Sequence, residues 1–455
     1  MPIPKALMTL AVPTIISQII NLIYNMVDTL FIGMTGDSYK IAGVTVAFTI
    51  FMLTIGLSNV FGIGGGSLIS RLMGRGKSEE ARNVAAFSIY GSIGISLLYS
   101  LLTFIFMDPL LRLLGASDET IRYGAQYLLW VVVFGGLPVI LSAVLAHLLR
   151  NVGQAKQASA GLSFGGVLNI ILDPLFMFVL LPKGMEVTGA ALATMISNVI
   201  ACLYLLFMVA RASQTEPLSL SPARLSRVRG HDLSELFSVG IPSGLLSGLF
   251  DLANIVANKL MSGHGDLALA ALGIVMKAER VPNAINIGLC QGMLPLVAYN
   301  FASGNHDRMN AAIKTTRRYG LIVAFTSVFL FIFLSKPVVN LFLNTDGEGA
   351  AVALTTVALA AGFLRLRSLA SPFQFLNFHA SFSLQAMGAG RETMLHAIVR
   401  ELVFYIPTMF LMNHLFHAQG LAVSLVIGEA LGALFVLILL EHWIKKHHMH
   451  SGAAI

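Results

Sequence analysis

The sequence predicts an all-α integral membrane protein whose twelve transmembrane helices form two six-helix lobes, related by pseudo-two-fold symmetry along the membrane normal. Three observations predict this fold class: the composition, twelve long apolar runs, and an internal repeat. Of the 455 residues, 56% are hydrophobic and 11% are charged, and the mean hydropathy is +0.80. Soluble domains carry about 25% charged residues. The composition therefore excludes a soluble protein, a disordered chain and most nucleic-acid binders, and we expect no nucleic-acid partner.

Each apolar run is long enough to cross a membrane, which takes about 20 residues of helix. The alternating pattern of an outer-membrane barrel is absent from these runs, so we interpret them as helices. The twelve predicted spans cover residues 6–34, 42–71, 84–107, 122–149, 157–181, 188–210, 235–262, 268–301, 312–334, 350–386, 393–413 and 420–443.

The positive charges predict the orientation of these spans. Eighteen Lys and Arg residues fall in the termini and loops on the side of the N-terminus, and only six fall in the loops on the other side. Because cytoplasmic loops are enriched in positive charge, both termini are predicted to be cytoplasmic. We expect a multi-pass protein of the plasma (inner) membrane of a prokaryote, with the lipid bilayer itself as its surroundings and no need for more than a monomer.

The sequence repeats itself between its two halves. Residues 11–44 match residues 240–273 at a constant offset of 229, which pairs Pro13 with Pro242 and Asn25 with Asn254. Two later segments also correspond, and they align Gly153 with Gly388 and Gly189 with Gly420. We therefore predict an N-terminal lobe at 1–210, a cytoplasmic linker at 211–234, a C-terminal lobe at 235–445 and a cytoplasmic tail at 446–455. Parallel repeats of this kind place a substrate site between the halves.

Polar residues recur at helical spacing within several predicted spans. Such residues are costly in a bilayer, so they mark a cavity or a pathway by default. The stripes that we assign to a substrate cavity contain Gln18, Asn21 and Asn25 in the first span, Asp251 and Asn254 in the seventh, Gln291 in the eighth, and Gln374 and Asn377 in the tenth. The alternative is that they form hydrogen bonds between helices that hold the bundle together.

Asp28 is the most informative of these polar residues. It lies in the outer half of the first span, where a carboxylate needs a partner or a cation. Asn169 and Asp173 share one face of the fifth span, and Thr194 lies in the sixth. Their hard oxygen ligands suit Na⁺, and two close carboxylates equally suit a proton, so the residues leave both ions open. The alternative for Asp173 is that the Asp173–Pro174 pair only caps a kink.

Further charged residues fall within the predicted spans of the second half. Some are expected to pair with one another and others to reach the interface, and the roles of Lys277, Arg280, Arg365 and Arg367 stay open. Motifs of membrane enzymes, such as a His-Glu-x-x-His segment, are absent from the sequence, so we predict that the protein is not an enzyme and needs no cofactor.

Several of these features together resemble one known family. Pro13 with Asp28 fifteen residues later, the Asn169/Asp173 pair, the Gly189–Thr194 segment and the Gln291–Asn300 segment are similar to those of the multidrug and toxic compound extrusion (MATE) family. The resemblance covers essentially the whole chain, and it is greatest to the prokaryotic, DinF-type or MepA-like branch.

The resemblance implies secondary antiport, in which organic, often cationic and amphipathic compounds are exported in exchange for H⁺ or Na⁺. It also implies an N-lobe cation site formed by Asp28, Asn169, Asp173, Thr194 and the backbone of Ala190. Pro13 would correspond to the proline whose bending accompanies the conformational switch.

One departure from the family concerns the C-terminal lobe. Some members have an acidic pair on the seventh and tenth helices, but here Asp251 is one residue out of step and the tenth span has Arg365 and Arg367 instead of a carboxylate. We therefore place the coupling in the N-lobe. The alternative function is a flippase of lipid-linked precursors from the same superfamily, which the two arginines keep open.

Overall fold

A computed structural model of the chain describes residues 1–342 and 350–451, and the described part is built from helices and their connections. The first half contains α1 (Ile3–Gly33), α2 (Ser38–Gly74), α3 (Ser78–Ile105), α4 (Met107–Leu113), α5 (Ile121–Leu128), η1 (Leu129–Phe134), α6 (Gly136–Asn151), α7 (Ala155–Pro174), η2 (Leu175–Leu180) and α8 (Glu186–Ala212). The second half contains η3 (Pro222–Arg227), α9 (Gly230–Ser262), α10 (Asp266–Ala302), α11 (His306–Phe333), α12 (Ser335–Asn340), α13 (Ala350–Ser368), α14 (Ser371–Met387), α15 (Gly390–Ile398), η4 (Val399–Tyr405) and α16 (Ile406–Ser451).

These helices account for the predicted spans. Nine described helical stretches are long and apolar enough to cross a membrane, and two further spans are broken, with bends of 49° before α6 and 47° before α14. The stretch Gly390–His447 is far longer than one crossing requires, and its backbone leaves the helical region at His417 (φ 54°, ψ −139°). Divided at His417, it supplies the eleventh and twelfth spans. The predicted fold class is thus confirmed.

Two of the predicted spans differ in shape from the continuous helices that the sequence led us to expect. The fourth changes from α5 through the π-helical turn η1 to α6, and the tenth is divided between α13 and α14. Both breaks occur at the corresponding span of each half, as the internal repeat requires. The fifth and eleventh spans also correspond, and each contains a π-helical turn, η2 and η4.

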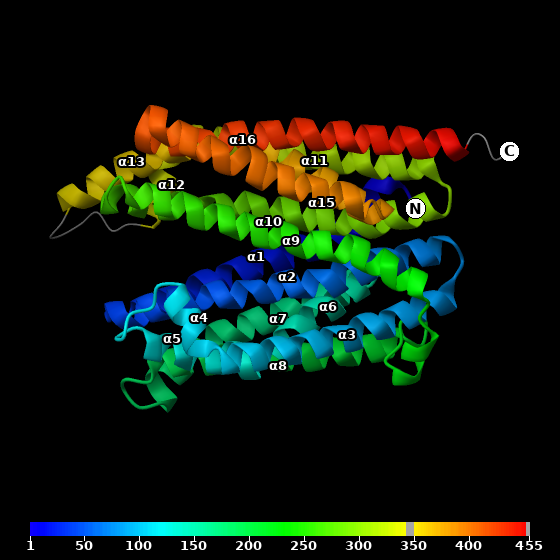
Figure 1. Cartoon of the computed structure of the whole chain (residues 1–455), viewed down its shortest axis with the longest axis horizontal. Helices are drawn as coiled ribbons and strands as arrows, with labels where there is room; N and C mark the ends of the chain where they lie inside the picture. Colours follow the sequence, from blue (N-terminus) through cyan, green and yellow to red (C-terminus); the bar gives the residue numbers. More distant parts are fainter. Residues whose placement is uncertain (343–349, 452–455) are drawn as a thin grey trace.

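The helices pack as two lobes, one formed by α1–α8 and the other by α9–α16 (Figure 1). The start of α1 and the end of α16 lie at the same end of the molecule (Figure 1). Between the lobes, α8 ends at Ala212 and α9 begins at Gly230, so that α9 starts inside the segment assigned to the linker. Residues 446–451 of the predicted tail continue α16, and residues 452–455 lie outside the described part.

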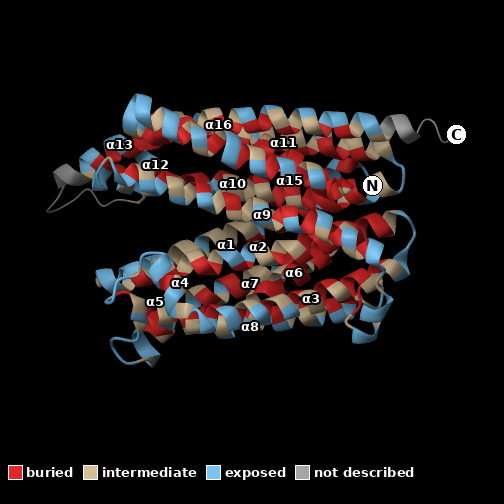
Figure 2. Ribbon diagram, viewed as in Figure 1, coloured by how far each residue is buried: buried red, intermediate tan, exposed pale blue. Residues whose placement is uncertain are grey.

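Each lobe has its own apolar core, and α1 takes part in both lobes. Ile3, Leu7 and Ala11 of α1 are buried among residues of α10, α11 and α14 in the C-lobe. Later residues of α1, such as Ile20 and Tyr24, pack against α7 of the N-lobe. Pro13 lies inside the part of α1 that contacts the C-lobe, because Ile15 still packs against that core. Figure 2 shows buried residues where the helices of a lobe face one another and exposed residues along the outer faces.

Apolar side chains cover much of that outer surface. Leu97, Leu101 and Phe104 on α3 and Phe325 and Phe329 on α11 are all more than half exposed. Exposed apolar bands of this extent are typical of surfaces that contact lipid. The chain is therefore a multi-pass membrane protein.

Candidate functional site

Close packing of α7 between α1 and α8 brings the predicted N-lobe residues together. A β-carbon at Gly166 would lie 3.0 Å from Ile20 Cγ2 of α1, and one at Gly165 would lie 2.8 Å from Ala201 Cβ of α8. The two adjacent glycines therefore allow both neighbours to approach α7 more closely than larger residues would. Asn169 and Asp173 follow one and two turns later on α7, at the level where they meet α1 and α8.

The N-lobe polar cluster consists of Asp28, Asn169, Asp173 and Thr194, and all four are buried. Asn169 Nδ2 donates to Asp173 Oδ1 at 3.1 Å and approaches Thr194 Oγ1 at 3.3 Å, so it joins α7 to α8. The Asp28 carboxyl of α1 lies within electrostatic range of Asp173 on α7. Ala190 is fully buried one turn before Thr194 on α8.

Several oxygens of this cluster lack a donor. Asp28 Oδ1, Asp173 Oδ2 and Asn169 Oδ1 are buried and have no hydrogen-bond partner within the described part of the chain. Buried polar atoms are normally paired, and two adjacent carboxylates without a positive partner are strongly unfavourable. The cluster is thus suited to take up a proton or a small cation. Because Asp173 bonds to the Asn169 side chain, the interpretation that it only caps a kink loses support.

Two tyrosines near the cluster escaped the sequence prediction. Tyr24 and Tyr127 are both within electrostatic range of Asp28 and Asp173. Tyr24 precedes Asp28 by one helical turn, so the spacing alone contained that signal. Tyr127 comes from α5, and only the tertiary fold brings it to the cluster.

The residues assigned to a substrate cavity divide into two groups. Gln18, Asn21 and Asn25 on α1, Asp251 and Asn254 on α9, and Gln291 on α10 are partly exposed. Gln18 Nε2 donates to Gln291 Oε1 at 3.2 Å and so links the two lobes, whereas Asn25 Nδ2 bonds back to the Asn21 carbonyl. Gln374 is buried on α14.

Asn377, which the sequence analysis assigned to the cavity stripe, is enclosed inside the C-lobe. Its side chain is fully buried and its Nδ2 donates to Glu429 Oε2 at 2.7 Å, while its Oδ1 meets His396 Nε2 at 3.0 Å. Helical spacing predicted a polar face on α14 but gave no information on whether that face meets a cavity or another helix.

Two of the arginines whose roles the sequence left unassigned have hydrogen-bond partners in the C-lobe. Arg367 forms a bidentate ion pair with Glu279 at 2.8 and 2.9 Å, and Arg365 Nε donates to Ser335 Oγ at 2.8 Å. Arg280 interacts electrostatically with Asp251. The charge of Arg367 is therefore neutralised within the lobe, whereas Ser335 leaves the charge of Arg365 in place.

The two lobes meet closely at the end of the molecule that contains the start of α1. A β-carbon at Gly64 of α2 would lie 2.6 Å from the Leu236 carbonyl of α9, and the backbones also meet at Gly56 and Gly244. Nearer that end, Arg71 Nη2 lies 3.4 Å from Glu235 Oε2, and Arg71 Nη1 donates to the carbonyls of α14 at Gln385 and Ala386.

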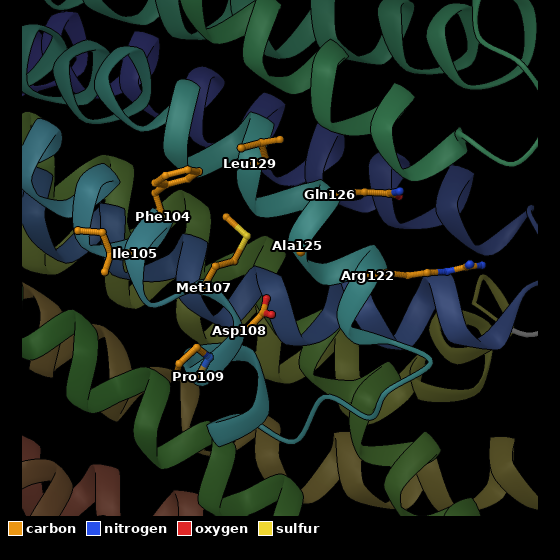
Figure 3. A pocket seen from close by; sticks show the side chains of 9 residues that line it. All are labelled: Phe104, Ile105, Met107, Asp108, Pro109, Arg122, Ala125, Gln126 and Leu129. Atoms are coloured by element: carbon orange, nitrogen blue, oxygen red, sulfur yellow. The ribbon is translucent and has the colours of Figure 1, made fainter.

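One surface hollow of about 640 Å³ lies apart from these residues, at the opposite end of the N-lobe. Figure 3 shows its lining, in which Phe104 and Ile105 come from α3, Met107 and Asp108 from α4, and Arg122, Ala125 and Gln126 from α5. It contains none of the predicted site residues.

Comparison with known families gives two matches within this one chain. The MatE family model matches residues 13–175 and again residues 242–411. The chain belongs to the MatE family. The two matches begin at Pro13 and Pro242, which are the residues that the internal repeat pairs, so the repeat corresponds to the duplicated MatE unit. The resemblance to this family predicted from the sequence is confirmed.

MatE relatives cover nearly the whole chain. A multidrug export protein MepA from Staphylococcus saprophyticus is 35% identical over 437 residues, which are 96% of this chain and 93% of the relative. A crystal structure of MATE in complex with MaL6 superposes with a TM-score of 0.91 at 22% identity and covers 98% of this chain and 97% of that one. An outward-facing multidrug resistance MATE family transporter of the MOP superfamily gives a TM-score of 0.89 at 22% identity, covering 98% and 97% of the two chains.

Proposed function

We propose that this protein is a secondary active efflux transporter that exports organic, often cationic and amphipathic compounds in exchange for H⁺ or Na⁺. Membership of the MatE family and 35% identity to a protein named as a multidrug export protein support the transporter class. A transporter of this class acts on small molecules without an enzymatic step. We further propose that it works as a monomer in the inner membrane of a prokaryote, with both termini cytoplasmic.

The observation that carries the coupling proposal is the N-lobe polar cluster with its three buried oxygens that lack donors. Binding of a cation stabilises a buried carboxylate that lacks hydrogen-bond donors, and disruption of the site removes that stabilisation. Asp28 belongs to α1, whose other half is packed into the C-lobe core. Ion binding at Asp28 is therefore linked through one helix to the position of the other lobe.

The contacts between the lobes support alternating access as the transport mechanism. The close approach of α2 to α9 at Gly64 lies toward the predicted cytoplasmic end, as does the Arg71–Glu235 ion pair, and the approach at Gly56 and Gly244 lies near the middle of both helices. We assign the structure to an outward-facing state that is closed toward the cytoplasm. A ligand shifts such an equilibrium only by binding one state better. We propose that the cation binds preferentially when the cluster faces outward, and the substrate when the cavity faces inward.

The contacts of the arginines weigh against the flippase alternative. A flippase for lipid-linked precursors needs unpaired positive charges that face its cavity. Arg367 is engaged by Glu279, and Arg365 donates to Ser335. Of the two residues that kept this alternative open, Arg367 is thus neutralised within the C-lobe, whereas Arg365 is exposed and keeps its positive charge.

Efflux from proteoliposomes tests the proposal directly. Vesicles containing a fluorescent organic cation are given either a pH gradient or a sodium gradient, and the gradient that drives transport identifies the coupling ion. Asp28→Asn should abolish the gradient-driven component. Asp118→Asn is a matched control, since that carboxylate is 81% exposed and contacts Arg112 at the surface. Full efflux by D28N would contradict the proposed coupling site.

A further inference from the structure

A second group of buried charges lies in the C-lobe, where the eleventh span meets α10, α13 and α16. We call it the C-lobe charge cluster, and it consists of Glu279, Arg367, Arg400, Glu401, Tyr405 and Glu429. Its members come from four different spans. Ion pairs join Arg367 to Glu279 and join Arg400 to both Glu401 and Glu429.

Within this cluster, Arg400 is matched by Glu429. Arg400 Nη2 donates to Glu429 Oε1 at 2.6 Å, and Arg400 Nε donates to Glu429 Oε2 at 3.1 Å. Asn377 adds a third donor to Glu429 at 2.7 Å. The rings of Phe250 and Phe378 lie 5.9 and 5.5 Å from the Arg400 guanidinium and enclose it. Arg400 and Glu429 thus form a bidentate pair with additional support.

Glu401 takes no part in the bidentate pair between Arg400 and Glu429. It is fully buried, and neither of its carboxyl oxygens has a hydrogen-bond partner among the residues that the structure describes. Its nearest cation is Arg400, whose Nη1 lies 3.4 Å from Glu401 Oε1. Because Glu429 already neutralises Arg400, an ionised Glu401 would add a second negative charge to one guanidinium. Such an uncompensated buried charge is strongly unfavourable.

Other charged groups around η4 do not supply the missing positive charge. Arg367 of α13 is neutralised by Glu279 of α10. His396 of α15 has both ring nitrogens engaged, with Ser381 Oγ at 2.7 Å and Asn377 Oδ1 at 3.0 Å. The acid of α9 in this region, Asp251, interacts with Arg280. Glu429, which shares Arg400 with Glu401, and Tyr405, four residues later in η4, bring no positive charge.

The internal repeat places Glu401 in the span that corresponds to the fifth span of the N-lobe. Aligning Gly153 with Gly388 and Gly189 with Gly420 makes the eleventh and twelfth spans the counterparts of the fifth and sixth. Those earlier spans hold Asn169, Asp173 and Thr194 of the N-lobe cluster. Asp173 lies two residues before the π-helical turn η2, which begins at Leu175, and Glu401 lies within the π-helical turn η4. Such turns are frequent at functional sites.

We propose that Glu401 is a proton-binding site of the C-lobe, protonated in the state described and able to exchange its proton when the surroundings of η4 rearrange. This site goes beyond the N-lobe coupling proposed above and does not depend on it. The proton binds to a carboxylate oxygen to form the neutral acid, so that the cluster carries no net charge.

Infrared difference spectroscopy of the full-length protein in lipid nanodiscs tests the proposal. Raising the pH should remove a carboxylic-acid stretching band that is present in the wild type and in D28N and is missing from E401Q. E441Q is the matched control, because Glu441 is exposed on α16 and contacts Lys445. E401D should retain the band at a shifted frequency, which separates loss of this acid from a general disturbance of the fold.

Thermal unfolding provides a second readout. Native Glu401 keeps its proton where the unfolded chain releases it, so the stability of the wild type should fall with rising pH more steeply than that of E401Q. An acid band that is identical in wild type, E401Q and E401D would overturn the proposal. A sodium-dependent increase in melting temperature that is lost in E401Q would also overturn it, by showing a metal-cation site. Either result leaves the Asp28 efflux test unaffected.

Discussion

Arg71 of α2 and Glu235 of α9 form an ion pair that joins the two lobes, with Nη2 3.4 Å from Oε2. The Arg71 side chain is 1% exposed, and its Nη1 also donates to two carbonyls at the end of α14. Arg71 thus contacts two helices of the C-lobe from a position in the N-lobe, at the predicted cytoplasmic end.

Glu235→Gln should loosen this end of the interface. Removing the charge leaves a buried guanidinium with weaker partners, and a hydrogen bond to a charged group contributes about 1.5–3 kcal/mol. In a background with Cys202 and Cys290 replaced by alanine, the thiol of S67C reports access, because Ser67 is buried beside Arg71. We expect its alkylation rate to rise about tenfold in E235Q.

Arg75→Ala is the control for this prediction. Arg75 Nη1 also lies near Glu235, at 3.6 Å, but its side chain is 38% exposed. Exposed pairs contribute about 0–1 kcal/mol, so the alkylation rate should change little. Equal rates in E235Q and the parent would show that the ion pair does not keep this end closed.

Gly166→Val should separate α1 from α7 and so disrupt the N-lobe polar cluster. A β-carbon at this position already lies 3.0 Å from Ile20 and 3.2 Å from Tyr24, and valine adds two methyl groups. Overpacking of this kind costs about 1–3 kcal/mol. We expect a lower melting temperature and loss of the ion-dependent thermal shift.

The matched control is Gly94→Val on α3, where a β-carbon would meet nothing within 4 Å. This variant should keep the thermal shift caused by the coupling ion. If G166V retains the same shift as G94V, the close approach of α1 and α7 is not needed for ion binding.

Breaking the Arg367–Glu279 pair should destabilise the C-lobe more than removing both charges together. Either R367M or E279Q leaves one buried charge alone, at a cost of about 3–5 kcal/mol, whereas the double variant R367M/E279Q leaves none. The free energy of unfolding in mixed micelles measures this coupling in a double-mutant cycle.

The exposed pair Arg112–Asp118 provides the comparison, since both side chains are more than half exposed. Its cycle should give a coupling energy below about 1 kcal/mol. Strictly additive effects at Arg367 and Glu279 would contradict the assignment of a stabilising buried pair.

Local patterns in the sequence were sufficient for the spans and for part of the site. Apolar runs and the repeat at Pro13 and Pro242 predicted the two lobes, because bilayer thickness fixes the length of a span. The four-residue spacing of Asn169 and Asp173 placed both on one face of α7, where the structure has them joined by a hydrogen bond.

The remaining features depend on contacts between helices that are distant in sequence. Periodicity placed Asn377 on a polar face of α14, but only the fold reveals that this face meets Glu429 and His396. In the same way, the partners of Arg367 and Arg400 lie on other spans, at sequence separations that local spacing does not address. Tyr127 joined the N-lobe cluster for the same reason.

The path of α1 through both lobes has a mechanical consequence. The helix is anchored in its first half by the C-lobe core, as far as Ile15, and further along by α7. Pro13 removes one backbone hydrogen bond near the end of the first anchor. If the halves separate at the cytoplasmic end, α1 has to flex, and the missing bond makes Pro13 the softest point along it. The free energy needed to bend α1 would then set a lower limit on the activation barrier of the conformational change in each transport cycle.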